Sequence, residues 1–196
     1  TGCSKYIAYF QAYTNTYAPV SYLRAIFTEA INHPDIVALS IATRCDCLPP
    51  DVLDLLEELN RIKPVWIELG LQTIHPQTTT LIRSGFTLSD YDLAVTELSK
   101  RNISIITHLI LGLPGEERSS LIKQAGLLSA LPLTTLKLHQ LQLIKGTRMA
   151  AEYHEHPEEF HLYSADEYID LVIDYVEHLR PDMVLERFVS QSPKEL

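Results

Sequence analysis

The sequence predicts an α/β fold in which parallel strands alternate with helices. Segments rich in β-branched and aliphatic residues recur along the 196 residues, and amphipathic helical patterns separate them. The strand segments are apolar, which is typical of a parallel sheet covered on both faces. No Gly-x-Gly-x-x-Gly follows the first strand, so a doubly wound dinucleotide site is disfavoured. Because a complete eight-fold barrel needs ~250 residues, we expect a partial TIM-like barrel of parallel strands that is incomplete at its N-terminus.

Local signals justify each predicted element in turn. Apolar residues at helical spacing define the first helix, and Pro49 with Pro50 suits the first turn of the second. Ser89 is a good N-cap for a longer helix, and Ser164 with Glu167 forms a capping box for the last one. In chain order, the expected elements are strand 5–11, helix 19–32, strand 36–42, helix 49–59, strand 65–71, short helix 77–82, helix 89–100, strand 103–111, helix 116–129, strand 136–143, helix 164–179 and strand 183–188.

The composition is that of an ordinary globular protein. The chain is 46% hydrophobic and 21% charged, and its net charge of −9 disfavours a broad nucleic-acid-binding face. No apolar run approaches the ~18 residues of a membrane span, so no membrane partner is expected. Three cysteines are too few for a disulfide framework and indicate a reducing, cytoplasmic location. We expect one domain over residues 1–196, lacking a first βα unit and a C-terminal extension because both ends look cut.

The apolar stretch at residues 103–111 ends abruptly in a turn. It has the composition of a strand buried on both faces, and Gly112, Pro114 and Gly115 stop it. Glu116 then opens a helical pattern whose first turn favours an acid. Loops at the carboxyl ends of parallel strands are where ligands bind in α/β folds. The stretch is therefore either a plain strand-to-helix connection or a ligand-facing loop.

Polar side chains gather where the predicted strands end. Parallel strands share one carboxyl edge, so these side chains are expected to meet there. Hydroxyls, amides, an arginine and carboxylates suit a ligand with ribose hydroxyls, an ammonium and a carboxylate. The candidates are Tyr13, Thr14 and Asn15 after the first strand, Thr43 after the second, Glu68 and Gln72 in the third, His108 in the fourth and His139 in the fifth.

Several candidates also have a structural explanation. Gln72 could cap the short helix that follows it, and Arg83 has the position of a solvated cation at a helix end. His108 and His139 lie in apolar strands, where a hydrogen-bonded structural histidine is more common than a metal ligand.

Two groups of residues that could bind a metal ion lack other features of a metal site. Cys45 and Cys47 lack a second cysteine pair to complete four ligands. His154, His156 and His161 lie in a stretch whose other residues look like solvated surface. We therefore expect no metal site in this chain.

Several motifs together resemble the YhcC-type radical S-adenosylmethionine (SAM) proteins. The most specific is Lys5-Tyr-Ile-Ala-Tyr-Phe-Gln-Ala-Tyr-Thr-Asn-Thr-Tyr-Ala-Pro19, and the similarity covers essentially the whole chain. The family is also similar to the coproporphyrinogen-oxidase-like and elongator-like branches of the superfamily. The remaining motifs are Thr43-Arg44, Asp46-Cys-Leu-Pro49, Glu68-Leu-Gly-Leu-Gln-Thr73, Thr107-His-Leu-Ile-Leu-Gly-Leu-Pro-Gly-Glu116, Lys137-Leu-His139 and Lys145-Gly-Thr147.

The resemblance implies an oxidoreductase-like enzyme whose partial (β/α)6 TIM-like barrel binds SAM across its strand ends. A [4Fe-4S] cluster would cleave SAM to a 5′-deoxyadenosyl radical, which abstracts hydrogen from a substrate. Carried over by position, the cofactor residues are Tyr13, Thr14 and Asn15 for the methionyl ammonium, Gln72 and Arg83 for the ribose or methionine side, His108 where some relatives place a ribose-binding acid, and Ile110, Gly112 and Glu116 for the adenine side.

One family motif is absent from the sequence. The cluster-binding Cys-x-x-x-Cys-x-x-Cys precedes the matching region in the family, and Cys3, Cys45 and Cys47 have the wrong spacing. Because three thiolates anchor such a cluster, we expect none on this segment and interpret it as an inactive core, truncated upstream. The full-length protein would use an external electron donor. Its substrate, an RNA or a small molecule, is not identified by the sequence.

Two other functions stay open. The barrel could be a non-catalytic module that holds a nucleotide-like ligand. It could also be a metal-dependent hydrolase that uses His108, His139 and acids, although several convergent His/Asp pairs at strand ends are missing from the sequence.

Overall fold

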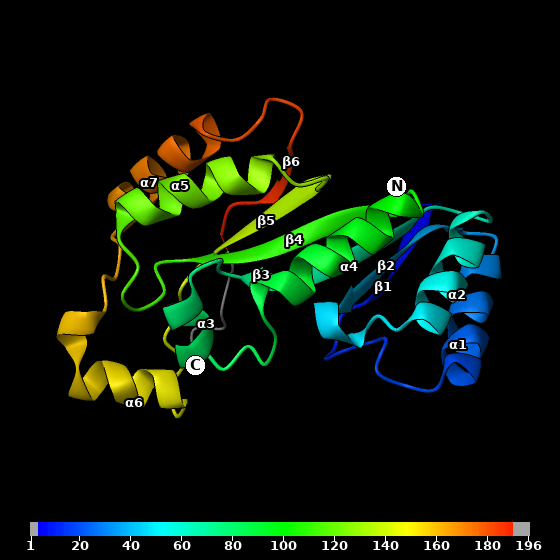
Figure 1. Cartoon of the computed structure of the whole chain (residues 1–196), viewed down its shortest axis with the longest axis horizontal. Coiled ribbons are helices and arrows are strands. Elements are labelled where there is room, and N and C mark those ends of the chain that lie inside the picture. The colour runs from blue at the N-terminus through cyan, green and yellow to red at the C-terminus, as the bar shows by residue number, and fades with distance from the viewer. Residues whose placement is uncertain (1–3, 190–196) are drawn as a thin grey trace. The chain divides into compact units, whose positions relative to one another are not determined.

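The strands form one sheet in the order in which they occur in the chain. The computed structural model describes residues 4–189, and Figure 1 shows helices between successive strands. A doubly wound sheet reverses its strand order at a switch point, whereas a (β/α) barrel keeps chain order. The predicted α/β fold of TIM-like barrel type is therefore confirmed. The strands are β1 (Tyr6–Phe10), β2 (Ile36–Thr43), β3 (Val65–Gln72), β4 (Ser104–Leu111), β5 (Thr135–Gln140) and β6 (Val184–Arg187).

Every predicted helix is present, and one further helix was not predicted. The additional α6 (Arg148–Glu155) is 8 residues long and has no buried residue, so it is too short and too polar to stand out in the sequence as a helix that packs on the core. Within residues 4–189, no helix combines the length and apolarity needed to cross a membrane. The other helices are α1 (Val20–Asn32), α2 (Pro50–Asn60), α3 (Pro76–Leu81), α4 (Leu88–Lys100), α5 (Arg118–Ser129) and α7 (Ala165–Glu177), with short 3-10 helices η1 (Cys45–Cys47) and η2 (Pro157–Glu159).

Capping residues set the helix starts, and one predicted cap is wrong. Ser164 and Glu167 form the expected capping box at α7. At α4 the N-cap is Thr87, not Ser89. The Thr87 amide donates to the Asp90 carboxylate at 2.7 Å, and the Asp90 amide donates to the Thr87 hydroxyl at 3.2 Å. This reciprocal pair satisfies amides that the first helical turn leaves without partners, and Ser89 becomes part of that turn.

Two other predicted boundaries differ from the structure. The amide of Glu116 donates to the Leu113 carbonyl at 3.2 Å, which closes a turn, and α5 begins only at Arg118. β5 ends at Gln140, so residues 141–143 are not part of the strand that was predicted to include them. Both differences lengthen the loops at the carboxyl ends of their strands.

The chain divides into two compact units, each with its own apolar core. The first contains β1, α1, β2, α2, α4 and most of β3, with parallel pairing of β1 to β2 and of β2 to β3. α1 packs on β2 and α2, and the Phe10 and Phe27 rings meet edge to face at 4.9 Å. Its fully buried side chains include Leu23, Phe27, Ile31, Leu39, Ile41, Leu55, Leu56, Ile67 and Leu69.

The second unit contains α3, the end of β4, and all elements from α5 to β6 except the turn before β5. α5 packs against α7, where the Arg118 guanidinium pairs with the Asp174 carboxylate. β5 and β6 pair in parallel. Fully buried side chains of this unit are Leu109, Leu111, Leu121, Ala125, Leu136, Leu138, Leu171 and Tyr175.

Gly112 ends β4 in a conformation that only glycine adopts easily. Its φ is +88°, and a Cβ at this position would lie 3.2 Å from two ring carbons of Tyr163. Two independent constraints, the backbone angle and the contact with the ring, therefore exclude a side chain here.

Replacing Gly112 should test both constraints. We expect Gly112→Ala to lower the free energy of unfolding by ~1–3 kcal/mol, because the left-handed backbone is strained for alanine and the methyl group crowds Tyr163. Gly126 lies within α5, and an added methyl group there would have no neighbour within 4 Å, so Gly126→Ala should raise stability by ~0.5–1 kcal/mol. Urea unfolding measures both, and a neutral Gly112→Ala would contradict the expectation.

Candidate functional site

In the first unit, Asn15 fastens the loop after β1. Its side-chain amide donates to the carbonyls of Phe10 and Ala42, each at 2.9 Å, and its own backbone amide donates to Ala42 at 3.2 Å. The Asn15 Nδ2 atom therefore bonds to the protein backbone, and the Oδ1 atom is the group that a ligand's ammonium could approach.

Thr43 and Glu68 lie in buried hydrogen-bond networks of the same unit. The hydroxyl of Thr43 lies 2.5 Å from that of Thr16, which in turn bonds to the Cys47 carbonyl. Glu68 is 3% exposed, and its carboxylate accepts bonds from the Tyr9 hydroxyl at 2.9 Å and from Ser40. Buried polar groups need such partners, so Thr43 and Glu68 both stabilise the fold. Their contact with SAM stays a prediction.

Three predicted site residues have left-handed backbones. Among residues 4–189, the non-glycine residues with positive φ are Tyr13 at 62°, Gln72 at 68°, Arg83 at 53° and Asn102 at 54°. Asparagine tolerates this region, whereas larger side chains occupy it at a cost. At Arg83 the left-handed backbone is the ordinary end of α3, because the Arg83 and Ser84 amides donate to the carbonyls of Thr80 and Thr79. Strain of this kind concentrates at functional sites, so among these three residues it supports Tyr13 and Gln72.

In the second unit, a cavity of about 320 Å³ opens at the ends of β3, β4 and β5. It contains four predicted residues, and the imidazoles of two of them, His108 and His139, stack with centroids 5.4 Å apart and an interplanar angle of 21°. We call it the His108 cavity. Its lining residues are Gln72, His108, Ile110, His139, Gln140, Leu141, Gln142 and Ile144.

The His108 cavity combines flat rings, amides and aliphatic side chains. Imidazole faces and the Ile110 side chain suit contact with a planar heteroaromatic ring. Gln72 and Gln140 add amide groups that can bond to ring nitrogens or hydroxyls. Two lining residues, Leu141 and Ile144, were not predicted, because the sequence pattern extended β5 too far and hid the loop that provides them.

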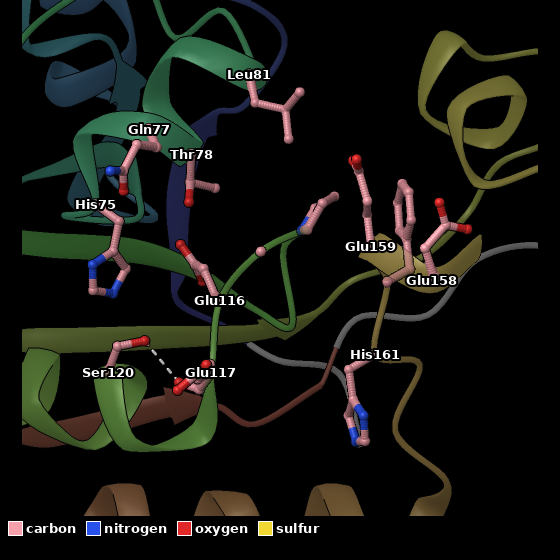
Figure 2. Close-up of a pocket in the computed structure, with 13 residues that line it drawn as sticks. His75, Gln77, Thr78, Leu81, Glu116, Glu117, Ser120, Glu158, Glu159 and His161 are labelled. Carbon is pink, nitrogen blue, oxygen red and sulfur yellow. Dashed lines mark hydrogen bonds between the residues drawn. The ribbon is translucent and has the colours of Figure 1, made fainter. Parts of the chain in front are cut away.

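Glu116 lies in a different cavity of the second unit. Its carboxyl accepts a bond from the Thr73 hydroxyl and faces a space of about 750 Å³, which we call the Glu116 cavity (Figure 2). The two cavities share no lining residue among those described, and Arg83 lines neither of them. Glu116 and Arg83 are therefore not among the residues that line the His108 cavity, although Thr73, which directly follows Gln72, bonds to Glu116.

Burial strongly perturbs the Glu116 carboxyl. Removal from water disfavours the charged form and raises its pKa to about 7, although hydrogen bonds from Thr73 and Thr78 oppose the shift. Near neutral pH this carboxyl is therefore divided between its protonated and ionised forms.

The described cysteines do not by themselves form an iron–sulfur cluster site. Residues 4–189 contain two cysteines, Cys45 and Cys47, whereas three thiolates anchor such a cluster. Burial raises the pKa of the Cys45 thiol to about 12, and burial also raises the pKa of Cys47. Within residues 4–189, no three His, Cys, Asp or Glu side chains converge to hold a metal ion.

Burial of Glu116 should make stability depend on pH. The folded protein, with a pKa of about 7 in place of 4.5, binds more protons between these values than the unfolded chain. The free energy of unfolding should therefore fall as pH rises through this range, and Glu116→Gln should remove this part of the dependence. Urea unfolding of both proteins at several pH values measures it. Identical pH profiles would contradict the prediction.

Models of known protein families match the chain along most of its length. A model of the Radical SAM superfamily matches residues 1–127, and a model of the Radical_SAM C-terminal domain matches residues 133–196. YtqA of Bacillus subtilis is 44% identical over 192 residues, which cover 98% of this chain and 59% of YtqA. YhcC of Escherichia coli K12 is 40% identical over 147 residues, covering 74% of this chain and 48% of YhcC. The chain thus spans about half to three-fifths of the length of these relatives.

A solved structure shares the fold. The Elp3 protein of the archaeon Methanocaldococcus infernus superposes with a TM-score of 0.83 over 98% of this chain and 49% of Elp3, at 18% identity. At this identity the likeness concerns the fold alone. The family matches confirm the resemblance found in the motifs, and the chain belongs to the radical SAM superfamily, whose enzymes carry out SAM-dependent radical chemistry.

Proposed function

We propose that this chain provides the SAM-binding part of a radical SAM enzyme and that the His108 cavity holds the nucleoside end of SAM. The observation that carries the proposal is the convergence of Gln72, His108, Ile110 and His139 at the carboxyl ends of β3, β4 and β5. This is the edge at which ligands bind in barrels of this type.

The chemistry of the lining suggests a role for each side chain. The stacked imidazoles of His108 and His139, together with Ile110, offer surfaces for the adenine ring. The Gln72 amide can donate to and accept from ribose hydroxyls. Gln72 is the last residue of β3, and its left-handed backbone turns the chain toward α3. The roles that the resemblance gives to Tyr13, Thr14, Asn15 and Arg83 stay predictions.

The iron–sulfur cluster of such an enzyme would be held outside the described residues. When bound, a [4Fe-4S] cluster supplies the electron that cleaves SAM. Because Cys45 and Cys47 do not fit it, we confine the proposed role of this chain to binding and orienting SAM. An oxidoreductase-like reaction, an external electron donor and an RNA or small-molecule substrate belong to the whole protein and remain proposals.

A protein that joins this chain to a cluster-binding segment provides the decisive experiment. With a Cys-x-x-x-Cys-x-x-Cys segment present, anaerobic reconstitution and reduction should produce 5′-deoxyadenosine from SAM, detected by mass spectrometry. The 196-residue chain alone should produce none and should bind SAM weakly, because cluster iron is a major anchor for SAM. SAM binding without cleavage by the reconstituted longer protein would instead favour the non-catalytic binding module.

Variants of the His108 cavity test the binding role directly. Gln72→Ala and His139→Ala should each raise the Kd for SAM about three- to tenfold, since one neutral hydrogen bond or one ring contact is lost. Lys123→Ala, on the exposed face of α5, is the matched control and should leave the Kd unchanged. Calorimetry on the cluster-containing protein measures the three values. Unchanged affinity in both cavity variants would remove this cavity from the SAM site.

A further inference from the structure

The Glu116 cavity is a second candidate binding site, separate from the His108 cavity. α3, the loop after β4 and residues 158–161 surround it, and its volume of about 750 Å³ is in the range of small-molecule sites. Figure 2 shows Thr78 and Leu81 above Glu116, with Glu158 and Glu159 across the space.

The walls of the Glu116 cavity are rich in carboxyl groups, and the described residues that line it include no lysine or arginine. Glu116 and Glu117 come from the loop after β4, and Glu158 and Glu159 from η2. Burial lowers the pKa of His75, which keeps this imidazole neutral near pH 7. Charge complementarity therefore favours a cationic ligand.

One of these carboxyl groups is buried and incompletely bonded. Glu116 is only 7% exposed; its Oε1 accepts the bond from Thr73 and Thr78 also favours its charged form, while its buried Oε2 makes no hydrogen bond of normal geometry within residues 4–189. The Nε2 atom of His75, on the same wall, is also buried without a partner among residues 4–189. An unsatisfied buried carboxylate oxygen is costly, and a ligand that donates hydrogen bonds would remove this cost.

The arrangement favours an extended organic cation over a metal ion. No three potential metal ligands converge within residues 4–189, so the carboxyl groups are spread along the cavity and do not surround one point. Leu81, Pro114 and Phe160 also line the cavity and offer apolar surface to an alkyl chain. We propose that the Glu116 cavity binds a linear aliphatic polyamine, whose ammonium groups pair with Glu116 and with Glu158 or Glu159 while its methylenes contact the apolar wall.

Calorimetry with spermidine as the probe tests the proposal on the 196-residue chain at about 0.15 M salt, where diffuse surface attraction is screened. One spermidine should bind per chain. Glu116→Gln should weaken binding about tenfold or more, because a charge-assisted bond to a buried carboxylate is lost. Glu159→Gln, at an exposed position, should weaken it about two- to fivefold. Glu177→Gln removes the same charge from the exposed end of α7 and should have no effect.

Three results would overturn the polyamine site. The first is an equal loss in Glu177→Gln and the cavity variants, which would indicate diffuse attraction to an acidic protein. The second is displacement of spermidine by an equal concentration of Mg²⁺, which would indicate an inorganic cation site. The third is an absence of binding to the unmodified chain. Should Glu116→Gln fail to fold by circular dichroism, Glu158→Gln and Glu159→Gln decide, because both side chains are exposed. None of these outcomes depends on SAM binding.

Discussion

The close approach of the backbone at Gly112 to the Tyr163 ring organises the ligand-facing side of the second unit. A φ of +88° ends β4 sharply, and the ring lies where a side chain would project. Residues before this turn, His108 and Ile110, line one cavity, whereas residues after it, from Pro114 to Glu117, line another. The turn at Gly112 thus places the side chains of β4 and those of the following loop in two cavities of different chemistry.

The two cavities differ in chemistry because their residues are buried in different ways. Stacked imidazoles, amides and aliphatic side chains line the His108 cavity, which suits a flat ring system. In the Glu116 cavity, burial holds a carboxyl near its midpoint of ionisation. Thr73 and Thr78 offset part of the cost of burying this group, and the proposed cationic ligand would offset more of it.

Much of the fold followed from local sequence signals. Apolar strands, the proline pair at α2 and the capping box at α7 predicted their elements correctly because these are local patterns. Thr87 and Ser89 both have side chains that suit an N-cap. Thr87 is the cap of α4 because it forms the capping box with Asp90. α6 was missed because it is short and polar and buries none of its residues.

The candidate site was less predictable than the fold. Strand-end polarity and family motifs pointed to Gln72, His108, Ile110 and His139, which line one cavity, whereas Glu116 lines another because of how the chain turns after Gly112. The left-handed backbones at Tyr13 and Gln72 are likewise features that no residue type indicates.

The assignment of SAM to the His108 cavity is tested most directly by the imidazole NMR signals of the cluster-containing protein during a titration with SAM. Signals of His108 and His139 should shift together as SAM binds, while those of His75 and His161, which line the Glu116 cavity, should stay in place. Shifts confined to His75 and His161, with His108 and His139 unchanged at saturating SAM, would contradict the assignment.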